Sequence, residues 1–485
     1  IGGGGFMVYR TAKGETAALD FREKAPAGVT RNMYLDAAGN AIEDKSLYGS
    51  LSAGVPGTVD GMVKAYDKYG KRSWKRLVQP AINLAINGFT ISETQARELN
   101  ENKNGFLKYN TSGNSFIRKA IWKKGDLLKQ PELGATLIQI RDNGRAGFYK
   151  GKVAANLIRE MNRGKGIITE KDLDAYSSTW RTPVIGYYKG YKIISMPPPS
   201  SGGIALIQLL QSISPYPLKK WGFNSDSTVR LIVEAERRVY ADRSKYLGDP
   251  DFFSVPQEQL LNPSYQLKRM STLDWQHATL SKDMNPGNLA STEKEETTHY
   301  SIVDKQGNSV SVTTTLNGSY GSLVVVKGDG FLLNNEMDDF SVKPGSPNAY
   351  GLIGGEANSI APGKRMLSSM TPTIIEKDSK LYMVVGTPGG ATIITSVFQA
   401  IINVIDFNMT MQDAVAARRF HSQWLPDVIY SEDGAFSSEL QQKLTEKGYN
   451  LAPRGLMGEV NAILSTPQGY QAGTDHRSDD AAAGW

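Results

Sequence analysis

Residues 297–317 have the sequence TTHYSIVDKQGNSVSVTTTLN. Two runs rich in β-branched and aromatic residues, His299 to Asp304 and Ser309 to Leu316, flank the polar residues Lys305 to Asn308. Such runs on either side of a short turn that contains glycine are typical of a β-hairpin. We therefore predict a hairpin at this place in the chain.

A polar segment precedes this hairpin. Between about Ser281 and Glu296 the sequence is rich in Asn, Pro, Gly, Ser and Glu and lacks apolar periodicity. It therefore predicts an exposed loop. The boundary between this loop and the following strand falls at Glu296-Thr297.

Helices dominate the sequence before the loop, and strands become frequent after it. The elements group by type, which favours packed sheets with helices outside and not an alternating parallel sheet. Predicted helices are Gly57 to Tyr69, Trp74 to Asn87, Ser92 to Asn100, Leu133 to Asn143, one from near Ile204, Ser227 to Leu247, Thr392 to Ile405, Met411 to Arg418 and Ser437 to Lys447. Further hairpins are predicted for residues 6–20, 373–386 and 460–473.

The composition excludes several kinds of chemistry. The chain of 485 residues has no cysteine, which removes disulfides, thiol nucleophiles and Cys-ligated metals. It has four histidines, none of them three to five residues from another, so a His-based metal site or a Ser-His-Asp triad is poorly supplied. No apolar run reaches the roughly 18 residues needed to span a bilayer. The common nucleotide, zinc-protease and serine-hydrolase motifs are also missing.

The charge is unevenly distributed around the same boundary. Residues 1–296 hold 42 basic and 30 acidic residues, a net charge of +12, whereas residues 297–485 hold 13 and 19, a net charge of −6. A basic half raises the alternative of nucleic-acid or membrane binding. Its basic residues are scattered among acids, as with Arg237, Arg238 and Arg243. A solvated surface that faces an acidic half is the better interpretation.

A threonine at the boundary offers one route to catalysis without histidine. If the chain is cut before Thr297, the new α-amino group can act as general base for the hydroxyl of the same residue. Its pKa of about 7.7–8.0 suits work near neutral pH. Threonine is also simply a good strand former, so the pattern alone leaves both interpretations open.

Longer motifs resolve this ambiguity through a resemblance. The hairpin sequence resembles the start of the small subunit of the γ-glutamyltransferases, also called γ-glutamyl transpeptidases or glutathione hydrolases, and the lid-bearing bacterial members in particular. Matching motifs run in the family's order along essentially the whole chain. They are residues 21–26 (FREKAP), 197–203 (PPPSSGG), 333–340 (LNNEMDDF), 367–370 (LSSM) and 386–390 (GTPGG).

The resemblance implies an α+β fold, the four-layer αββα sandwich of the N-terminal-nucleophile hydrolases. It also implies a precursor that cuts itself between Glu296 and Thr297. Residues 1–296 would form a large subunit and residues 297–485 a small one, intertwined in one structural domain. The activity implied is γ-glutamyl transfer from glutathione and related donors to water, amino acids or peptides, through a γ-glutamyl-Thr297 intermediate and without a cofactor or metal.

Roles for individual residues come from the same resemblance. Thr297 matches the nucleophile, Thr315 the threonine that hydrogen-bonds it, and Gly389 and Gly390 the oxyanion hole. The residues matched to donor binding are Arg22, Ser368 and Ser369 on the α-carboxylate and Asn317, Glu336 and Asp339 on the α-ammonium. Glu336 stands where some members have glutamine.

Two further expectations concern the surroundings of the site. Residues 344–355, rich in Gly and Pro around Tyr350, resemble the lid of bacterial members, and a lid favours small donors over polymeric γ-glutamate. Family members carry a strand, a helix and an export signal before the glycine run Gly2 to Gly5. We therefore expect an N-terminally truncated large subunit, with one sheet left incomplete, from a periplasmic or secreted enzyme.

Two alternatives remain at this stage. The first is an acylase of the same fold that removes glutaryl-type side chains from β-lactams. Such a substrate has no α-ammonium group, so Asp339 and Glu336 would have no purpose, which argues against it. The second is a non-catalytic homologue or a basic binding module. The retained threonine, glycine pair and arginine argue against degeneration, and no basic-aromatic stripe supports nucleic-acid binding.

Overall fold

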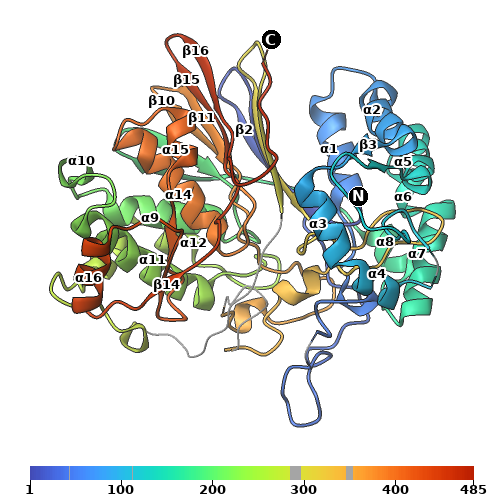
Figure 1. Cartoon of the computed structure of the whole chain (residues 1–485), viewed down its shortest axis with the longest axis horizontal. Coiled ribbons are helices and arrows are strands. Elements are labelled where there is room, and N and C mark those ends of the chain that lie inside the picture. The colour runs from blue at the N-terminus through green and yellow to red at the C-terminus, as the bar shows by residue number, and fades with distance from the viewer. Residues whose placement is uncertain (43, 112, 285–296, 346–352, 485) are drawn as a thin grey trace.

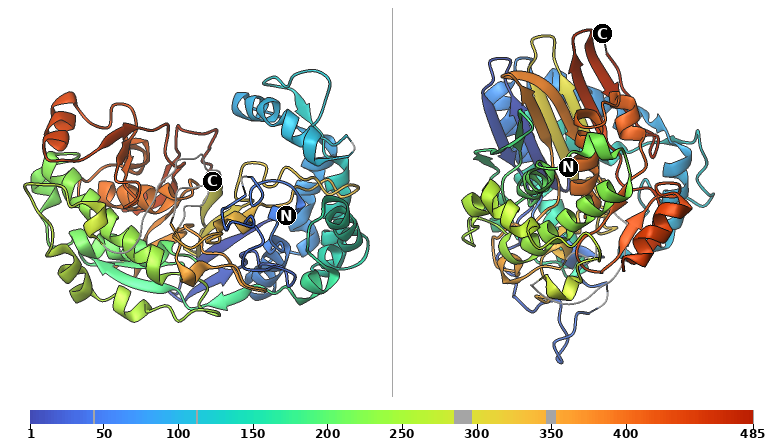
Figure 2. Two further views of the ribbon diagram at one scale, coloured as in Figure 1. Left: turned by 90° about the horizontal axis from the view of Figure 1, so that it is seen from below. Right: turned by 90° about the vertical axis from the view of Figure 1, so that its left-hand side faces the viewer.

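The computed structural model describes residues 1–485 except 43, 112, 285–296, 346–352 and 485 (Figure 1). Two antiparallel sheets lie face to face, and the right-hand view of Figure 2 shows their strands side by side. The first sheet has the order β5 (Thr179–Arg181), β2 (Thr16–Asp20), β1 (Gly4–Arg10), β9 (Ser309–Thr315), β8 (Thr298–Val303). The second has the order β16 (Gly469–Gly473), β15 (Asn461–Thr466), β11 (Lys380–Gly386), β10 (Thr373–Lys377), β7 (Tyr191–Ser195), β6 (Val184–Tyr188).

Both sheets combine strands from the two sides of residue 297. In the first sheet, β1 lies between β2 and β9, with Phe6 opposite both Asp20 and Thr313. In the second, β10 pairs with β7, which places Ile374 opposite Ile194. Each sheet therefore holds the two parts of the chain together through continuous backbone hydrogen bonding.

The alternation of side chains along the strands separates two cores. Phe6 and Val8 point into the space between the sheets, where they pack with residues of the second sheet such as Ile374 and Val384. Met7, from the other face of β1, packs outward in a cluster that includes Ala65 of α1 (Thr58–Tyr69). This period of two is what a strand buried on both faces requires.

Helices cover the outer faces. Helices α9 (Gly202–Ile213) and α14 (Thr392–Ile405) pack on the second sheet, and α11 (Asp226–Tyr246) packs on α9. Helix α1 packs on β1 and β2 of the first sheet. Figure 1 places the sheets between these two groups of helices. The α+β sandwich with the layers αββα, expected from the sequence, is confirmed.

The remaining elements surround this sandwich. Helices α2 to α8 form a subdomain beside α1, at the right of Figure 1, where α2 packs against α5. They are α2 (Trp74–Asn87), α3 (Glu93–Glu101), α4 (Lys103–Tyr109), α5 (Pro131–Asn143), α6 (Ala146–Tyr149), α7 (Gly151–Gly164) and α8 (Glu170–Ala175), with β3 (Phe89–Thr90) and β4 (Leu127–Leu128). The others are α10 (Leu218–Trp221), α12 (Gln257–Leu260), α13 (Pro263–Met270), α15 (Met411–Ala416), α16 (Ser438–Glu446), β12 (Phe420–His421), β13 (Ile429–Ser431) and β14 (Leu451–Pro453).

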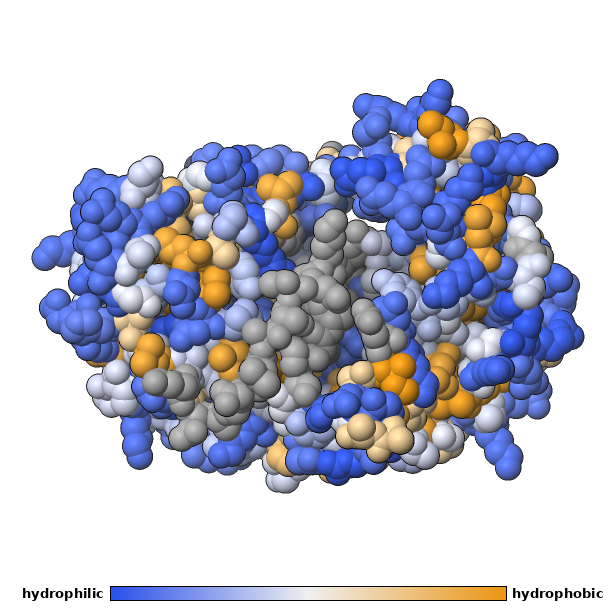
Figure 3. All heavy atoms as spheres, turned by 60° about the horizontal axis from the view of Figure 1, so that its bottom comes forward, coloured by the Kyte–Doolittle hydropathy of each residue, from blue (hydrophilic) through white to orange (hydrophobic). Residues whose placement is uncertain are grey.

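Figure 3 shows how hydrophobic residues are distributed on one side of the molecule. On the side shown in Figure 3, hydrophobic residues form small patches separated by hydrophilic ones. No helix in the described part of the chain is long and apolar enough to span a bilayer. Residues 346–352 of the predicted lid, which include Tyr350, lie outside the described residues, as does Glu296, the residue before the predicted cleavage site.

The glycine run near the start of the chain enters the central strand of the first sheet. A Cβ on Gly2 would lie 1.9 Å from the carbonyl oxygen of Leu332, and one on Gly5 would lie 2.3 Å from that of Thr313. A Cβ on Gly4 would lie 2.5 Å from Oε2 of Glu23. The run is therefore required by close packing of backbone and of a buried acid against β1, and not by flexibility.

The contact between the two sheets near the site also depends on a glycine. A Cβ on Gly386, at the end of β11, would lie 2.2 Å from Cε1 of His299 on β8. We expect Gly386→Ala to lower the free energy of unfolding by about 1–3 kcal/mol through overpacking. The melting temperature in a thermal scan should fall accordingly. Gly455→Ala is the matched control, because no atom lies within 4 Å of its added Cβ. Equal melting temperatures for the two variants would contradict this packing argument.

Candidate active site

A pocket opens where the ends of several elements meet, and its empty space, including the part open to solvent, is about 330 Å³. Thr297 precedes β8, Thr315 ends β9, Gly390 precedes α14, and Arg22 follows β2. The side chains that line it come from both sides of residue 297 in sequence. They belong to Arg22, Arg243, Thr297, Thr315, Asn317, Glu336, Asp339, Leu367, Ser368, Ser369, Met370 and Ile393, and Gly390 adds backbone.

The β8–β9 ladder determines where Thr297 lies. Thr298 is opposite Thr314 in the register, so Thr297 stands one residue further, opposite Thr315. Asn317 N–H donates to Oγ1 of Thr315 at 2.7 Å, which holds that hydroxyl at the end of the strand. The side-chain amide of Asn317 donates to the carbonyl of Asn335 at 3.1 Å. Both predicted threonines are thus brought to the same pocket.

Gly389 and Gly390 form the turn between β11 and α14. Their φ angles of 128° and 43° are conformations that L-residues with side chains rarely adopt. The Gly389 carbonyl is already hydrogen-bonded, because it accepts from the N–H and the Oγ1 of Thr392 at 2.9 and 2.8 Å. Among the residues that the structure describes, no acceptor takes the N–H of Gly389 or of Gly390. Such N–H groups at a pocket wall can bind a developing oxyanion.

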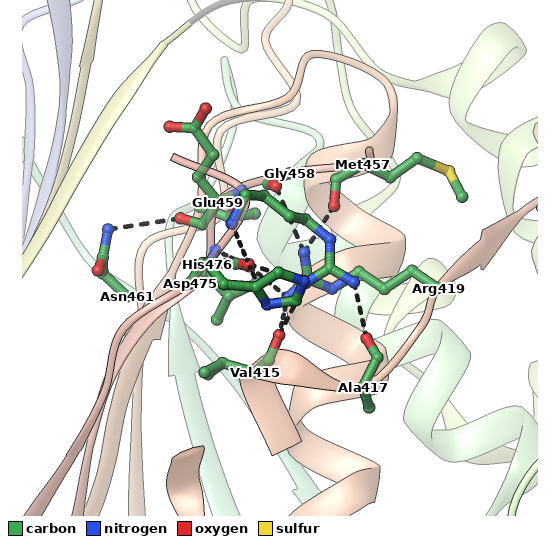
Figure 4. A network of polar contacts seen from close by, with 12 residues as sticks. Val415, Ala417, Arg419, Met457, Gly458, Glu459, Asn461, Asp475 and His476 are labelled. Carbon is green, nitrogen blue, oxygen red and sulfur yellow. Dashed lines mark hydrogen bonds and ion pairs between the residues drawn. The ribbon is translucent and has the colours of Figure 1, made fainter. Parts of the chain in front are cut away.

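A buried network of hydrogen bonds and ion pairs supports the segment that packs against this turn (Figure 4). The sequence did not predict this network. Arg419 donates to the carbonyls of Met457 and Val415, both at 2.6 Å, and forms an ion pair with Asp475 at 2.6 Å. Asp475 also accepts from the backbone N–H of Val460 at 2.9 Å. These contacts stabilise the segment 457–460.

That segment in turn lies against the glycine turn. The backbone N–H of Glu459 donates to Oγ1 of Thr387 at 2.7 Å. A Cβ on Gly389 would come within 3.2 Å of the Cα of Gly458. Arg477 completes the network through ion pairs with Asp475 and Glu432 at 2.8 and 2.5 Å. In sequence these residues are single charges without a motif, so only the fold reveals their connection.

Arg22 lines the pocket and is surrounded by acidic side chains. Its side chain is 1% exposed, and its guanidinium pairs with Glu336 at 2.5 Å, with Asp339, and with Glu23 at 3.6 Å. Its Nε donates to the carbonyl of Met366 at 3.4 Å. The fork of Arg22 is therefore occupied by groups of its own chain.

Burial shifts the acids around Arg22 towards their neutral forms. Desolvation raises the pKa of the Glu23 carboxyl to about 7, although the charge of Arg22 opposes this. Desolvation likewise raises the pKa of Glu336 far above its usual range and raises the pKa of Asp339. Three carboxyl groups around one guanidinium cannot all ionise at low cost, so protons are shared within the cluster.

The two predicted serines belong to a segment held by neighbouring backbone. Ser368 Oγ accepts from the N–H of Met370 at 3.1 Å, and its carbonyl accepts from the N–H of Ser201 at 2.7 Å. Ser369 Oγ accepts from the guanidinium of Arg243 at 3.2 Å. Arg243 is the pocket residue that sequence reasoning assigned to a solvated surface, because it stands in a mixed run of acids and bases.

The arrangement supplies hydroxyl chemistry and charge recognition. Among the described residues, no group of three or more His, Asp or Glu side chains could hold a metal ion. Of the residues predicted for the site, Arg22, Thr297, Thr315, Asn317, Glu336, Asp339, Ser368, Ser369 and Gly390 line this one pocket, and Gly389 adjoins Gly390. An αββα sandwich with a threonine at the head of a strand, facing such a pocket, defines the class of N-terminal-nucleophile hydrolases.

Comparison with known proteins identifies the family within this class. The family model for gamma-glutamyltranspeptidase matches residues 1–485, so the chain belongs to the γ-glutamyltranspeptidase family. It is 46% identical over 489 residues to a glutathione hydrolase proenzyme of Escherichia coli (strain K12), covering 100% of this chain and 84% of the relative. The protein is thus an enzyme of the γ-glutamyl-transfer and glutathione-hydrolysis class.

Solved structures agree with the fold. A γ-glutamyltranspeptidase of Helicobacter pylori is 47% identical with a TM-score of 0.58, over 59% of this chain and 83% of that one. A cephalosporin acylase of Bacillus halodurans superposes with a TM-score of 0.86 at 24% identity, over 100% of this chain and 87% of that one, which shows a shared fold.

An acylase relative is more distant in sequence. The acylase ACY 1 proenzyme of Pseudomonas sp. (strain SE83) is 32% identical over 485 residues, covering 97% of this chain and 83% of the relative. The acylase alternative is therefore supported only by a more distant relative. The assignment as an enzyme removes the non-catalytic alternative.

His299, two residues after Thr297, provides a pH test of the packing beneath the site. Ser301 Oγ donates to the carbonyl of Asn461 at 3.1 Å and so accepts from Nε2 of His299 at 3.1 Å. Thr313 Oγ1 then donates to Nδ1 at 2.9 Å. Desolvation lowers the pKa of this imidazole to about 3, so it is neutral in the folded protein.

Acid should therefore destabilise the parent more than a variant without this imidazole. The unfolded chain binds a proton at His299 below pH 6.5, which the folded chain refuses until about pH 3. Between pH 6.5 and 5 this removes about 2 kcal/mol of unfolding free energy. When denaturation is measured across this pH range, His299→Gln should lose correspondingly less unfolding free energy than the parent. The exposed His277→Gln should keep the parent's slope; equal slopes for parent and His299→Gln would refute the assignment.

Proposed function

We propose that the precursor cuts itself between Glu296 and Thr297 and that Thr297 then carries the γ-glutamyl group of the donor. The observation that supports this best is the position of Thr297. It heads a strand whose register places it opposite Thr315, in one pocket with Gly390 and Arg22.

Cleavage follows from the chemistry of a hydroxyl next to a peptide bond. The Thr297 hydroxyl attacks the carbonyl carbon of residue 296, and the C–N bond breaks to leave an ester and a free α-amine. Water hydrolyses the ester, which frees the main-chain α-carboxylate of Glu296 and restores the Thr297 hydroxyl. The α-amine, with a pKa of about 7.7–8.0 in solution, becomes the general base of the mature enzyme.

Catalysis repeats the same attack on the donor. The α-amine takes the hydroxyl proton as Oγ1 of Thr297 attacks the γ-carbonyl, and the N–H groups of Gly389 and Gly390 stabilise the oxyanion. The proton passes to the leaving amine, and a γ-glutamyl ester remains. Water then gives glutamate, or the amine of an amino acid or peptide gives a new γ-glutamyl amide.

The charge cluster suits the zwitterionic end of a γ-glutamyl donor. The donor's α-ammonium pairs with Asp339 and Glu336 beside Asn317, and its α-carboxylate pairs with Arg22 beside Ser368 and Ser369. In the structure the acids and Arg22 bind one another, and both halves of a zwitterion replace these contacts without a net change of charge. A ligand with only one of the two charges would leave an unmatched buried group.

Residues 1–296 and 297–485 act as large and small subunits of one intertwined domain. Support comes from the two mixed sheets and from the net charges of +12 and −6. The lid residues 344–355 with Tyr350 favour glutathione-sized donors, and the enzyme works in the periplasm or outside the cell. These last assignments follow the family.

The cleavage step predicts a difference in intact mass. The expressed parent should give two fragments, of 296 and 189 residues. Thr297→Ala should give one uncut chain, because no hydroxyl is present to attack residue 296. Thr298→Ala, one residue along the same strand, is the control and should be cut as the parent is. An uncut but active parent would refute the proposal.

Donor choice separates γ-glutamyl transfer from the acylase alternative. The parent should release p-nitroaniline from γ-glutamyl-p-nitroanilide at least about tenfold more efficiently than from glutaryl-p-nitroanilide, since the latter leaves Asp339 and Glu336 without a cation. The measured quantity is kcat/KM for each donor. A preference for the glutaryl donor would favour the acylase.

A further inference from the structure

A second arginine lies in the donor pocket. Arg243 projects from α11, is 4% exposed, and lines the pocket together with Arg22. Its Nε donates to Ser201 Oγ at 2.9 Å and one terminal nitrogen donates to Ser369 Oγ at 3.2 Å. Within the described part of the chain, no carboxylate lies at ion-pair distance from it. The Asp339 carboxylate attracts Arg243 only from beyond that distance, and Asp339 itself forms an ion pair with Arg22.

Buried arginines elsewhere on the same helix are compensated: Arg230 pairs with Asp226, and Arg238 pairs with Glu234 at 2.5 Å. Desolvation lowers the pKa of Arg243 to about 10, so the guanidinium still carries its charge at neutral pH. A buried charge without an ion-pair partner is unfavourable, and an anionic ligand in the pocket would offset that desolvation cost.

The two serines that Arg243 contacts connect it to the backbone of the site. The segment 197–203, a sequence motif without a function so far, runs beside the segment 368–370. Ser201 donates to the Ser368 carbonyl through both N–H and Oγ, each at 2.7 Å. Ser200 Oγ donates to the Met370 carbonyl at 2.6 Å. Arg243 bridges the two segments through one serine of each.

The bridge also orients a hydroxyl. Ser369 Oγ accepts from Arg243, and among the described residues no acceptor takes its own hydroxyl hydrogen. With a lone pair held by the guanidinium, the O–H can point to an acceptor in the pocket. The nearby fork of Arg22 is already occupied by Glu336, Asp339 and the Met366 carbonyl.

We propose that Arg243 is a positioning residue that makes the enzyme require a free α-carboxylate on its donor. It turns the Ser369 hydroxyl towards that carboxylate and adds a second positive charge beside Arg22. The donor's carboxylate then lies between the two arginines, and a neutral group in its place leaves Arg243 without an ion-pair partner. This inference rests on the γ-glutamyl transfer proposed above.

The test compares two donors that differ only at this group: γ-glutamyl-p-nitroanilide and its α-carboxamide. Arg243→Gln should raise KM for the first donor by about tenfold or more, because a charge-assisted hydrogen bond is lost, with kcat changed much less. For the α-carboxamide, kcat/KM should stay within about twofold. Arg243→Lys should recover part of the loss, since it restores the charge but not the fork.

Controls separate this role from a purely structural one. Arg230→Gln removes a buried arginine of the same helix that does not line the pocket, and it should not change the ratio of the two donors. Intact mass of each variant reports cleavage. If Arg243→Gln stays uncut, the donor ratio is measured on Arg243→Lys. If the α-carboxamide is turned over too slowly, inhibition constants of L-glutamate and L-isoglutamine give the same ratio.

The outcomes are distinct. A fall by the same factor for both donors, or no change for either, would overturn the role of Arg243. Absence of p-nitroaniline release by the parent would instead overturn the proposed function itself.

Discussion

The antiparallel ladder of β8 with β9 is the constraint on which the site depends. It places Thr297 opposite Thr315, and β1 extends the same sheet on the other side of β9. A shift by one residue would turn the threonine to the opposite face. The second sheet prevents this shift, because His299 fills the space above Gly386 and the apolar core closes behind it.

The buried charges of the pocket serve ligand recognition and do not stabilise the fold. Glu23, Glu336 and Asp339 surround Arg22, and burial moves the pKa of all three acids upward. Such a cluster is weak evidence of stabilisation, because desolvation offsets much of the attraction. The cluster is better explained as a pre-formed charge pattern for a small zwitterion. The stability of the surrounding sandwich offsets the desolvation free energy of these buried charges.

Helices were predictable from the sequence where apolar residues recur with a clear helical period. Trp74–Asn87 and Thr392–Ile405 have the predicted bounds, and Ser92 caps α3 with the full capping box. Helix α7 was missed although Val153, Leu157 and Met161 recur at four-residue spacing, because glycines at both ends suggest a loop. Among site residues, Arg243 was missed because helix α11 carries eight charged side chains besides it, and a sequence does not show which of them face a cavity.

By itself the sequence determined the class of fold, the family resemblance and the motifs that carry threonine, glycine and charge. Those features depend on local order along the chain, which pattern and spacing express. The tertiary structure alone decided that Arg22 is paired with acids, that Arg243 is not, and that Arg419 and Arg477 support the glycine turn. These facts depend on contacts between residues from 38 to 317 positions apart in the sequence, and the packing of the sandwich determines which charges meet.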